Sequence, residues 1–254
     1  PVRDPFFMMI RRSLNTFMNA FTSSDWTAYP FATMNKKDFS NLLDVYLDSA
    51  FFPNLDNLDF AQEGHRLEIN DESNLEIKGV VYNEMKGAMS SIPSQLWHGL
   101  SKYLYPESTY QFNSGGNPEN IRELSHDELV NFHKKHYHPS NATFFTFGDM
   151  NPEDIQKVVS KNVLKNFQPS LEKIEVKNET RITTPIHRSE AYNPIPGDDN
   201  NHHVVLRWLL NESHNHVELL ETYLLSNILL DNSASPLRKA LEGSDLGIAL
   251  FQLT

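Results

Sequence analysis

Apolar residues recur every three or four positions through most of the chain, and this spacing is typical of amphipathic helices. The clearest helix start is at Ser125, which is followed three residues later by Glu128, as in a capping box. Asp4 and Pro5 form a second start signal, an N-cap residue followed by proline at the first helical position. The spacing predicts helices over 5–14, 35–52, 75–91, 93–105, 125–137, 151–167, 214–230 and 235–247, and a shorter helix or turn over 57–69.

Other stretches follow the pattern of β-strands. Residues 18–22 and 26–32 are rich in threonine and aromatic side chains and flank the turn sequence Ser-Ser-Asp, so they predict a hairpin. Pro30 has no backbone N–H, which indicates that the second strand has an unpaired side or ends there. The apolar runs 141–149 and 202–210 predict two further strands, the first of them buried.

Residues 168–200 differ in composition from the chain on either side of them. They hold several prolines and many charges but no long apolar period, which is typical of a connection between domains. Residues 1–167 then form one domain, whereas 201–254 hold one strand and two helices, too little for an independent core. Because helices and strands are intermixed throughout, the sequence predicts an α+β layered architecture.

Charge and composition narrow the classes of partner and compartment. The formal net charge is -11, which repels nucleic acid and anionic membrane surfaces, so neither is expected as a partner. No apolar run approaches the ~18 residues of a membrane-spanning helix. The absence of cysteine excludes disulfides and cysteine-bound zinc, and it fits a reducing compartment, either the cytoplasm or the matrix of a mitochondrion or another organelle.

Three histidines within six positions, His133, His136 and His138, raise the question of a metal site. The first two could share a helix face, but Lys134 and Lys135 lie between them, and positive charge opposes metal binding. Histidine near a helix C-terminus is also favoured by the helix dipole. A structural role for these side chains is the better interpretation, with metal binding as the alternative.

Glu84 is a more informative residue than any of these histidines. If 78–90 is helical, Glu84 is the one charged residue on a stripe whose other members are Val80, Val81, Gly87 and Ala88. A carboxylate on a core-facing stripe needs a hydrogen-bond donor, a cation or a metal. From the residues alone, a buried ion pair or a wrongly assigned inner face explains Glu84 at least as well as a functional carboxylate does.

Five stretches in register together resemble a known family. They are PVRDPFF (1–7), FMNAFTSSDWTAYPF (17–31), GVVYNEMKGAM (79–89), SGGNPENIREL (114–124) and FHKKHYHPSNATFFTFGD (132–149). The chain resembles the presequence-protease branch of the pitrilysin/insulinase zinc metallopeptidases, strongly over 1–167 and more weakly over 190–254. The resemblance implies a layered antiparallel sheet with helices on one face. It also implies part of a catalytic-type domain over 1–167, a linker over 168–200 and the incomplete start of a second similar domain over 201–254.

The same resemblance implies a zinc site that this chain holds only in part. In the family, the motif H-x-x-E-H supplies two histidine ligands and a glutamate general base. A distant glutamate in the NEMKG block is the third ligand, and by resemblance this residue is Glu84. No H-x-x-E-H occurs in the 254 residues. We therefore expect a fragment of a zinc metalloendopeptidase that is inactive alone and whose partners include the upstream and C-terminal parts of the same enzyme. The alternative is a non-catalytic relative with a peptide-binding or structural role.

The resemblance further implies where an extended peptide binds. In the family, peptide adds as a strand to the edge strand of the catalytic domain. The matching residues here are Asn19, Ala20, Phe21 and Thr22, and the small side chain of Ala20 suits the close approach of a peptide backbone. Phe6 and Phe7 could line a hydrophobic side-chain pocket, with ordinary core packing as an equal alternative. The implied substrates are unfolded oligopeptides, including targeting peptides.

Overall fold

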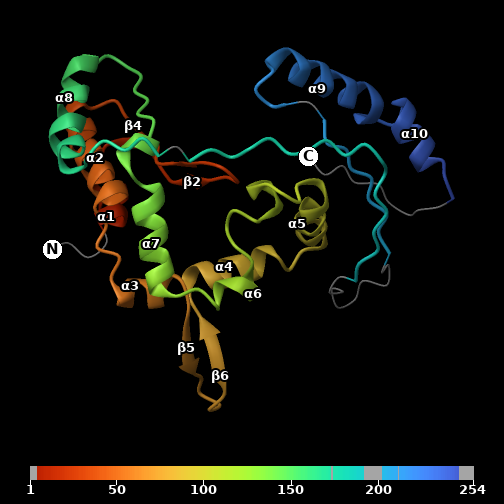
Figure 1. Cartoon of the computed structure of the whole chain (residues 1–254), viewed down its shortest axis with the longest axis horizontal. Helices are drawn as coiled ribbons and strands as arrows, with labels where there is room; N and C mark the ends of the chain where they lie inside the picture. The colour runs from red at the N-terminus through yellow and green to blue at the C-terminus, as the bar shows by residue number, and fades with distance from the viewer. Residues whose placement is uncertain (1–4, 173, 192–201, 211, 246–254) are drawn as a thin grey trace. The chain divides into compact units, whose positions relative to one another are not determined.

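The computed structural model describes residues 5–172, 174–191, 202–210 and 212–245 (Figure 1). The chain divides into two compact units, one formed by 1–89 with 108–178 and the other by 90–107 with 179–254. The described residues contain helices and small antiparallel sheets of two strands each, so the α+β prediction is confirmed. The predicted domain boundaries after residues 167 and 200 remain a prediction. None of the described helices is long and apolar enough to span a membrane.

The first unit begins with α1 (Pro5–Arg12), followed by a hairpin of four short strands. These are β1 (Asn15–Met18), β2 (Phe21–Thr22), β3 (Thr27–Ala28) and β4 (Phe31–Thr33). Strand β1 pairs with β4 and β2 with β3, and the Ser23 N–H donates to the Trp26 carbonyl at the turn. The predicted hairpin and its turn are therefore confirmed. The break between the two pairs lies beside Pro30, which has no N–H to give to the ladder.

The core of the first unit lies between α2 (Lys36–Phe51) and α8 (Pro152–Asn162), which pack against each other. Asn35 starts α2, because its side chain accepts hydrogen bonds from two backbone N–H groups of the first turn. Leu47, Val159 and Val163 are buried there, and each fully buried aliphatic side chain contributes about 1.5–3 kcal/mol. Half-buried apolar residues surround them: Leu43, Phe51, Ile155, Val158 and Phe167.

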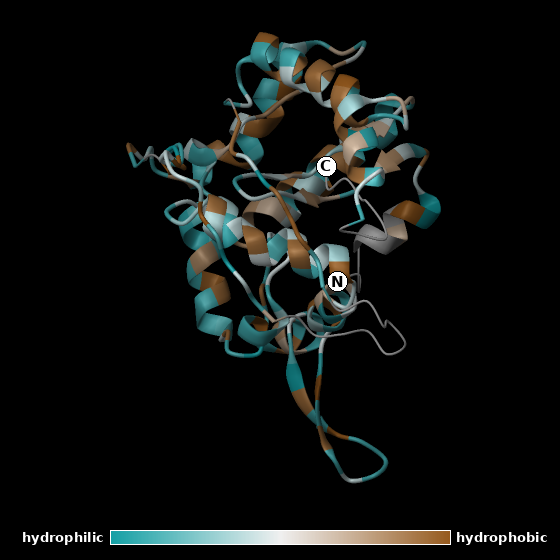
Figure 2. Ribbon diagram, turned by 90° about the vertical axis from the view of Figure 1, so that its right-hand side faces the viewer, coloured by the Kyte–Doolittle hydropathy of each residue, from teal (hydrophilic) through white to brown (hydrophobic). Residues whose placement is uncertain are grey.

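A second hairpin follows α3 (Asn57–Glu63) and extends away from α3 and α4 (Figure 1). It consists of β5 (Arg66–Ile69) and β6 (Leu75–Lys78), and α4 (Val80–Ala88) comes directly after it. The predicted helix 75–91 is therefore wrong over 75–78. The sequence Leu-Glu-Ile-Lys alternates with period two, and Figure 2 shows hydrophobic and hydrophilic stretches mixed along this hairpin. Gly79 separates strand from helix as the N-cap residue of α4.

The remaining helices of the first unit are α6 (Pro118–Ile121) and α7 (His126–His136). The capping box of Ser125 and Glu128 is present at the start of α7, as predicted. Short 3₁₀ turns η1 (Thr109–Gln111), η2 (Pro139–Asn141) and η3 (Leu164–Asn166) lie between the helices.

The predicted buried strand over 141–149 is wrong in the described structure. These residues form no ladder with any other described residue, and Phe145 and Phe147 are 87% and 93% exposed. A strand is stable only when a neighbouring strand pairs with its backbone groups. The apolar run is therefore extended and exposed, because no described strand pairs with it.

The second unit contains α5 (Ile92–Leu104), α9 (His216–Leu230) and α10 (Pro236–Glu242), all at predicted positions. The predicted strand over 202–210 is wrong in the same sense as that over 141–149, since it forms no ladder among the described residues. Its side chains still alternate in burial, as in an extended chain. Arg207 packs on the Trp97 ring at 4.1 Å and donates to the Ser101 hydroxyl at 3.2 Å, which holds this segment against α5.

Candidate functional site

The predicted peptide-binding residues lie on an exposed edge of the first hairpin. All four, Asn19, Ala20, Phe21 and Thr22, are exposed. In the part of the chain that the structure describes, β1 and β2 each pair on one side only. No described strand pairs with their other side, which is the geometry that peptide addition requires. The Thr22 carbonyl on β2 already accepts from the Ser114 hydroxyl at 3.4 Å. The structure brings these residues together but does not test their role.

Asn19 closes part of this edge with its own side chain. The Asn19 N–H donates to the Pro30 carbonyl at 3.2 Å, on the paired side of the hairpin. Asn19 and Ala20 lie in the break between β1 and β2. The Ala20 N–H donates to the Asn19 side-chain Oδ1 at 2.9 Å. An incoming peptide carbonyl must replace this side-chain oxygen to reach the Ala20 N–H.

Side chains from two helices fix the base of the hairpin. The Phe31 ring lies 5.1 Å from that of Phe39 and 4.9 Å from that of Tyr46, both in α2. The Tyr29 and Tyr137 hydroxyls share a hydrogen bond of 2.7 Å, which joins the hairpin to the end of α7. Burial, and then this hydrogen bond, raises the pKa of Tyr29.

Glu84 lies on the outer face of α4, opposite to the orientation expected from the sequence. The side chains of Val80 and Val81 are 53% and 38% exposed, whereas Met85 is 8% exposed. Helix α4 packs against α3 and α6, and Met85 is its buried residue. The expectation that the Glu84 stripe faces the core is therefore wrong. In this helix of nine residues, Met85 and not the stripe of Val80, Val81 and Glu84 is buried.

The Glu84 carboxylate is free to bind a ligand. It is exposed, and it has no hydrogen-bond or ion-pair partner among the described residues. Valine side chains flank it on the same exposed stripe. A carboxylate is a good zinc ligand, but a catalytic zinc needs three protein ligands. No group of three or more potential metal ligands occurs among the described residues, so Glu84 fits zinc only as one member of a larger set.

The three clustered histidines do not form a metal site. The His133 ring donates from Nε2 to the Ala50 carbonyl at 2.9 Å. His138 accepts from the Ser140 N–H at Nδ1 and donates from Nε2 to the Gln168 carbonyl. A neutral imidazole has one donor and one acceptor nitrogen, so the His138 ring is fully used within the protein. These contacts support the structural interpretation.

His136 is likewise part of the packing. Its ring stacks on Phe132 with centroids 4.2 Å apart. Burial, and then the charge of Lys135, lowers the pKa of His136. The side chain therefore stays neutral at pH 7 and contributes as an aromatic surface.

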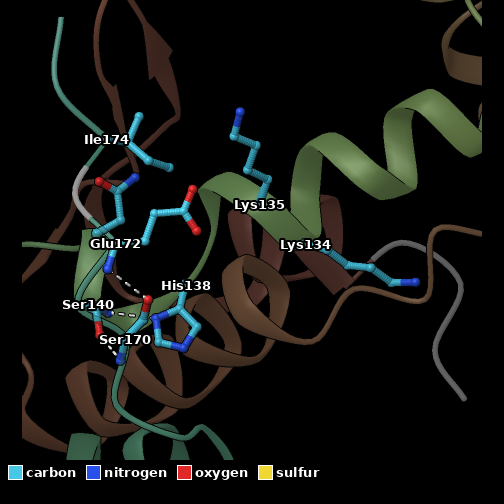
Figure 3. Close-up of a pocket in the computed structure, with 8 residues that line it drawn as sticks. Lys134, Lys135, His138, Ser140, Ser170, Glu172 and Ile174 are labelled. Atoms are coloured by element: carbon cyan, nitrogen blue, oxygen red, sulfur yellow. Dashed lines mark hydrogen bonds between the residues drawn. The ribbon is translucent and has the colours of Figure 1, made fainter.

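A small pocket of about 110 Å³ lies beside His138 (Figure 3). In Figure 3 the Lys134 and Lys135 side chains point in different directions, so their charges do not converge on one point. The Ser170 N–H donates to the Ser140 hydroxyl at 3.3 Å. Together with the hydrogen bond from His138 to Gln168, this contact ties residues 168–170 to the turn at 138–141. Residues of both segments line the pocket.

Phe6 and Phe7 lie in α1, but their side chains are outside what the structure describes. Their role in a hydrophobic pocket stays a prediction. Sequence reasoning also gave no role to the SGGNPENIREL block. Its first residues belong to a loop that contacts the first hairpin at Thr22. The presence of this block in the resemblance was the one sequence feature that could have indicated the loop.

Comparison with known proteins identifies the family of this chain. The family model described as the Peptidase M16 inactive domain matches residues 123–251. The chain is 43% identical to the mitochondrial presequence protease of Xenopus tropicalis over 256 residues, and 42% identical to that of Mus musculus over 260 residues. It is 38% identical to Protein HypA of Clostridium perfringens over 253 residues.

These alignments cover 97% or 98% of this chain but only 24–26% of the relatives, so the chain spans about a quarter of their length. The family match covers half of the chain, and the predicted resemblance to the presequence-protease branch is confirmed. The chain belongs to the M16 peptidase family.

Proposed function

We propose that this chain is part of a zinc metalloendopeptidase that degrades unfolded oligopeptides. In that enzyme it supplies the peptide-binding edge and one of the zinc ligands. The observation that carries the proposal is the free, exposed carboxylate of Glu84, in the same compact unit as the open edge at 19–22. Membership of the M16 family implies zinc in the intact enzyme.

The role of Glu84 in this proposal is to hold the metal. When bound, zinc supplies Lewis-acid chemistry, activating a water and polarising the scissile carbonyl. The Glu84 carboxylate provides one anionic oxygen ligand. The two histidine ligands and the general base belong to an H-x-x-E-H segment, which these 254 residues do not contain. On this proposal the chain alone is inactive.

The role of the hairpin edge is to orient the peptide. An extended peptide that pairs with β1 and β2 takes the place of the Asn19 side chain at the Ala20 N–H. Because Ala20 carries only a methyl group, the peptide backbone can approach closely there. Main-chain pairing of this kind binds unfolded segments with little regard to sequence, which suits substrates such as targeting peptides.

The relatives suggest the setting of this activity. Those from Xenopus tropicalis and Mus musculus are named mitochondrial presequence proteases. We extend this to a mitochondrial or other organelle matrix as the compartment of this chain. The partners are then the peptide substrates and the further polypeptide that completes an enzyme of the relatives' length.

A second candidate function is that of a non-catalytic peptide-binding protein. The description of the matching family model as an inactive domain favours it. The two candidates share the hairpin edge and differ in whether Glu84 binds metal.

The test is Glu84→Gln in a longer polypeptide that adds an H-x-x-E-H segment to this chain. We expect the variant to lose bound zinc and at least about 100-fold in peptide cleavage, since even residues behind the ligands change affinity or activity by ~10–100-fold. Glu123→Gln, an exposed carboxylate of the same unit, is the matched control and should change neither quantity. Full zinc content and full rate in Glu84→Gln exclude Glu84 as the ligand. Cleavage by the 254-residue chain alone contradicts the proposal as a whole.

A further inference from the structure

The loop 108–116 contacts the turn of the first hairpin through three side-chain hydroxyls. The Thr109 hydroxyl donates to the Ser24 carbonyl at 2.9 Å. The Tyr110 hydroxyl donates to the Asp25 carboxylate at 2.5 Å, and the Ser114 hydroxyl donates to the Thr22 carbonyl at 3.4 Å. The Tyr110 bond is the strongest of these, because its acceptor is ionised. The loop thus holds the end of the hairpin that lies farthest from α2.

The other end of the same loop lies directly on α4. A Cβ added at Gly115 would lie 2.4 Å from the Sδ of Met85, the buried residue of that helix. Gly116 has a φ of +93°, a conformation that other residues rarely adopt, and it lies against Ile121 of α6. The two glycines therefore allow the loop to approach α4 and α6 more closely than any larger residue would.

Asn113 connects these two ends. Its side-chain oxygen accepts from the Gly115 N–H at 3.0 Å, and its side-chain nitrogen lies 3.6 Å from the sulfur of Met89, just after α4. The turn that contains the glycines is thereby fixed in the orientation that meets α4. One short segment thus contacts both parts of the candidate site.

We propose that the loop 108–116 is a positioning element that fixes the hairpin turn relative to α4. If the proposed function holds, on which the catalytic role of the loop rests, the loop sets where the bound peptide lies relative to Glu84. Displacing reacting groups by ~1 Å can reduce a rate by ~100-fold, so an edge strand that is fixed only at its base is poorly suited to catalysis. None of the loop residues belongs to the cluster of Leu47, Val159 and Val163, so the loop is not part of the packing between α2 and α8.

The absence of cysteine makes a direct distance measurement possible in the chain itself. Spin labels are attached at Trp26→Cys in the hairpin turn and Lys86→Cys in α4, both at exposed positions. With the loop unchanged, we expect a single narrow distance distribution. Adding Thr109→Val and Tyr110→Phe should broaden or shift it, because two of the three contacts to the turn are lost.

Three further variants make the result specific. Thr109→Ser keeps the hydroxyl, so when it replaces Thr109→Val in the double variant it should reduce the broadening to that of Tyr110→Phe alone. Tyr110→Phe alone should broaden the distribution to a smaller extent, and it stays informative if the double variant fails to fold. Asn162→Ala, which removes a 3.0 Å hydrogen bond to Asp44 elsewhere in this unit, should have no effect.

An unchanged distribution in the folded Tyr110→Phe and double variants overturns the proposal. Equal broadening by Asn162→Ala also overturns it, because the effect would then be general loosening. The measurement uses neither peptide nor metal. Its outcome therefore tests the role of the loop independently of the proposed function, which Glu84→Gln tests separately.

Discussion

The two hairpins of the first unit differ in regularity and in how they are held. The hairpin β5–β6 has four consecutive cross-strand pairs, from Arg66 opposite Lys78 to Ile69 opposite Leu75. The hairpin β1–β4 has an irregular register between Asn15 and Phe17 and a break beside Pro30. Judged by strand pairing alone, the second hairpin is the better formed of the two.

The irregular hairpin is the one that distant parts of the chain contact, whereas Arg66 of the regular hairpin donates to the nearby Ala61 carbonyl of α3. Rings of α2, a tyrosine at the end of α7 and three hydroxyls of the loop 108–116 all contact it. The regular hairpin depends mainly on its own strands, through ion pairs of Glu68 and a bond from Asn70 to Glu76. Regular pairing keeps a hairpin's shape, whereas contacts to other elements fix its position, and a peptide-binding edge needs a fixed position.

The largest expected effect comes from removing the ring that anchors the first hairpin. Phe31→Ala loses the contacts with Phe39 and Tyr46, and because Phe31 is only half-buried we expect a loss of about 2–3 kcal/mol, below the 3–5 kcal/mol of a fully buried ring. The measurement is the free energy of unfolding from urea titration. Leu67→Ala in β5, a residue that is 64% exposed, is the control and should cost less than about 1 kcal/mol. Equal losses at the two positions contradict the comparison.

A smaller effect is expected at the junction with α7. Tyr29→Phe removes the hydrogen bond to Tyr137 and should cost about 1 kcal/mol, the usual net value of such a bond. Burial raises the pKa of Tyr29 in the folded protein, so its contribution is present below the unfolded pKa of ~10 and is lost as the pH rises toward the folded value.

The pH dependence separates this bond from general loosening. The free energy of unfolding of the unmodified chain should fall more steeply above pH ~10 than that of Tyr29→Phe. Tyr82→Phe is the control, because the Tyr82 hydroxyl has no hydrogen-bond partner among the described residues. Parallel pH curves for the unmodified chain and Tyr29→Phe contradict the role given to this bond.

The contrast between the hairpins also explains which features could be predicted from the sequence. A helix satisfies its backbone within a few residues, so periodicity and caps identified α2, α5, α7 and α8. A strand depends on a partner that can lie anywhere in the chain. Periodicity therefore proposed strands at 141–149 and 202–210, although the described structure contains no partner for either.

The candidate site was predictable only through resemblance. Nothing local distinguishes Asn19 or Ala20 from other polar or small residues, and the hydrogen bond between them lies in the break between β1 and β2. The inner face of α4 was misjudged because its apolar stripe is exposed and Met85 alone faces inward. The positioning role of Tyr110 depends on a contact between residues 85 positions apart, which no sequence pattern reports.

The smallest expected effect belongs to the self-contained hairpin. Lys78, and then Arg66, lowers the pKa of the Glu68 carboxyl by hydrogen bonding. A lowered pKa means that the contribution is present above the unfolded value of about 4.3 and is lost as the pH falls toward the folded value. The Glu68 side chain is 36% exposed, and ion pairs near the surface contribute little to stability, so Glu68→Gln should change the unfolding midpoint less than Tyr29→Phe does. Salt at ~1 M, where charges are screened within about 3 Å, should remove the difference between Glu68→Gln and the unmodified chain, whereas the effect of Phe31→Ala should persist. A salt-independent loss in Glu68→Gln, as large as that of Phe31→Ala, would mean that the second hairpin is also anchored by packing, and the distinction between the two hairpins would not hold.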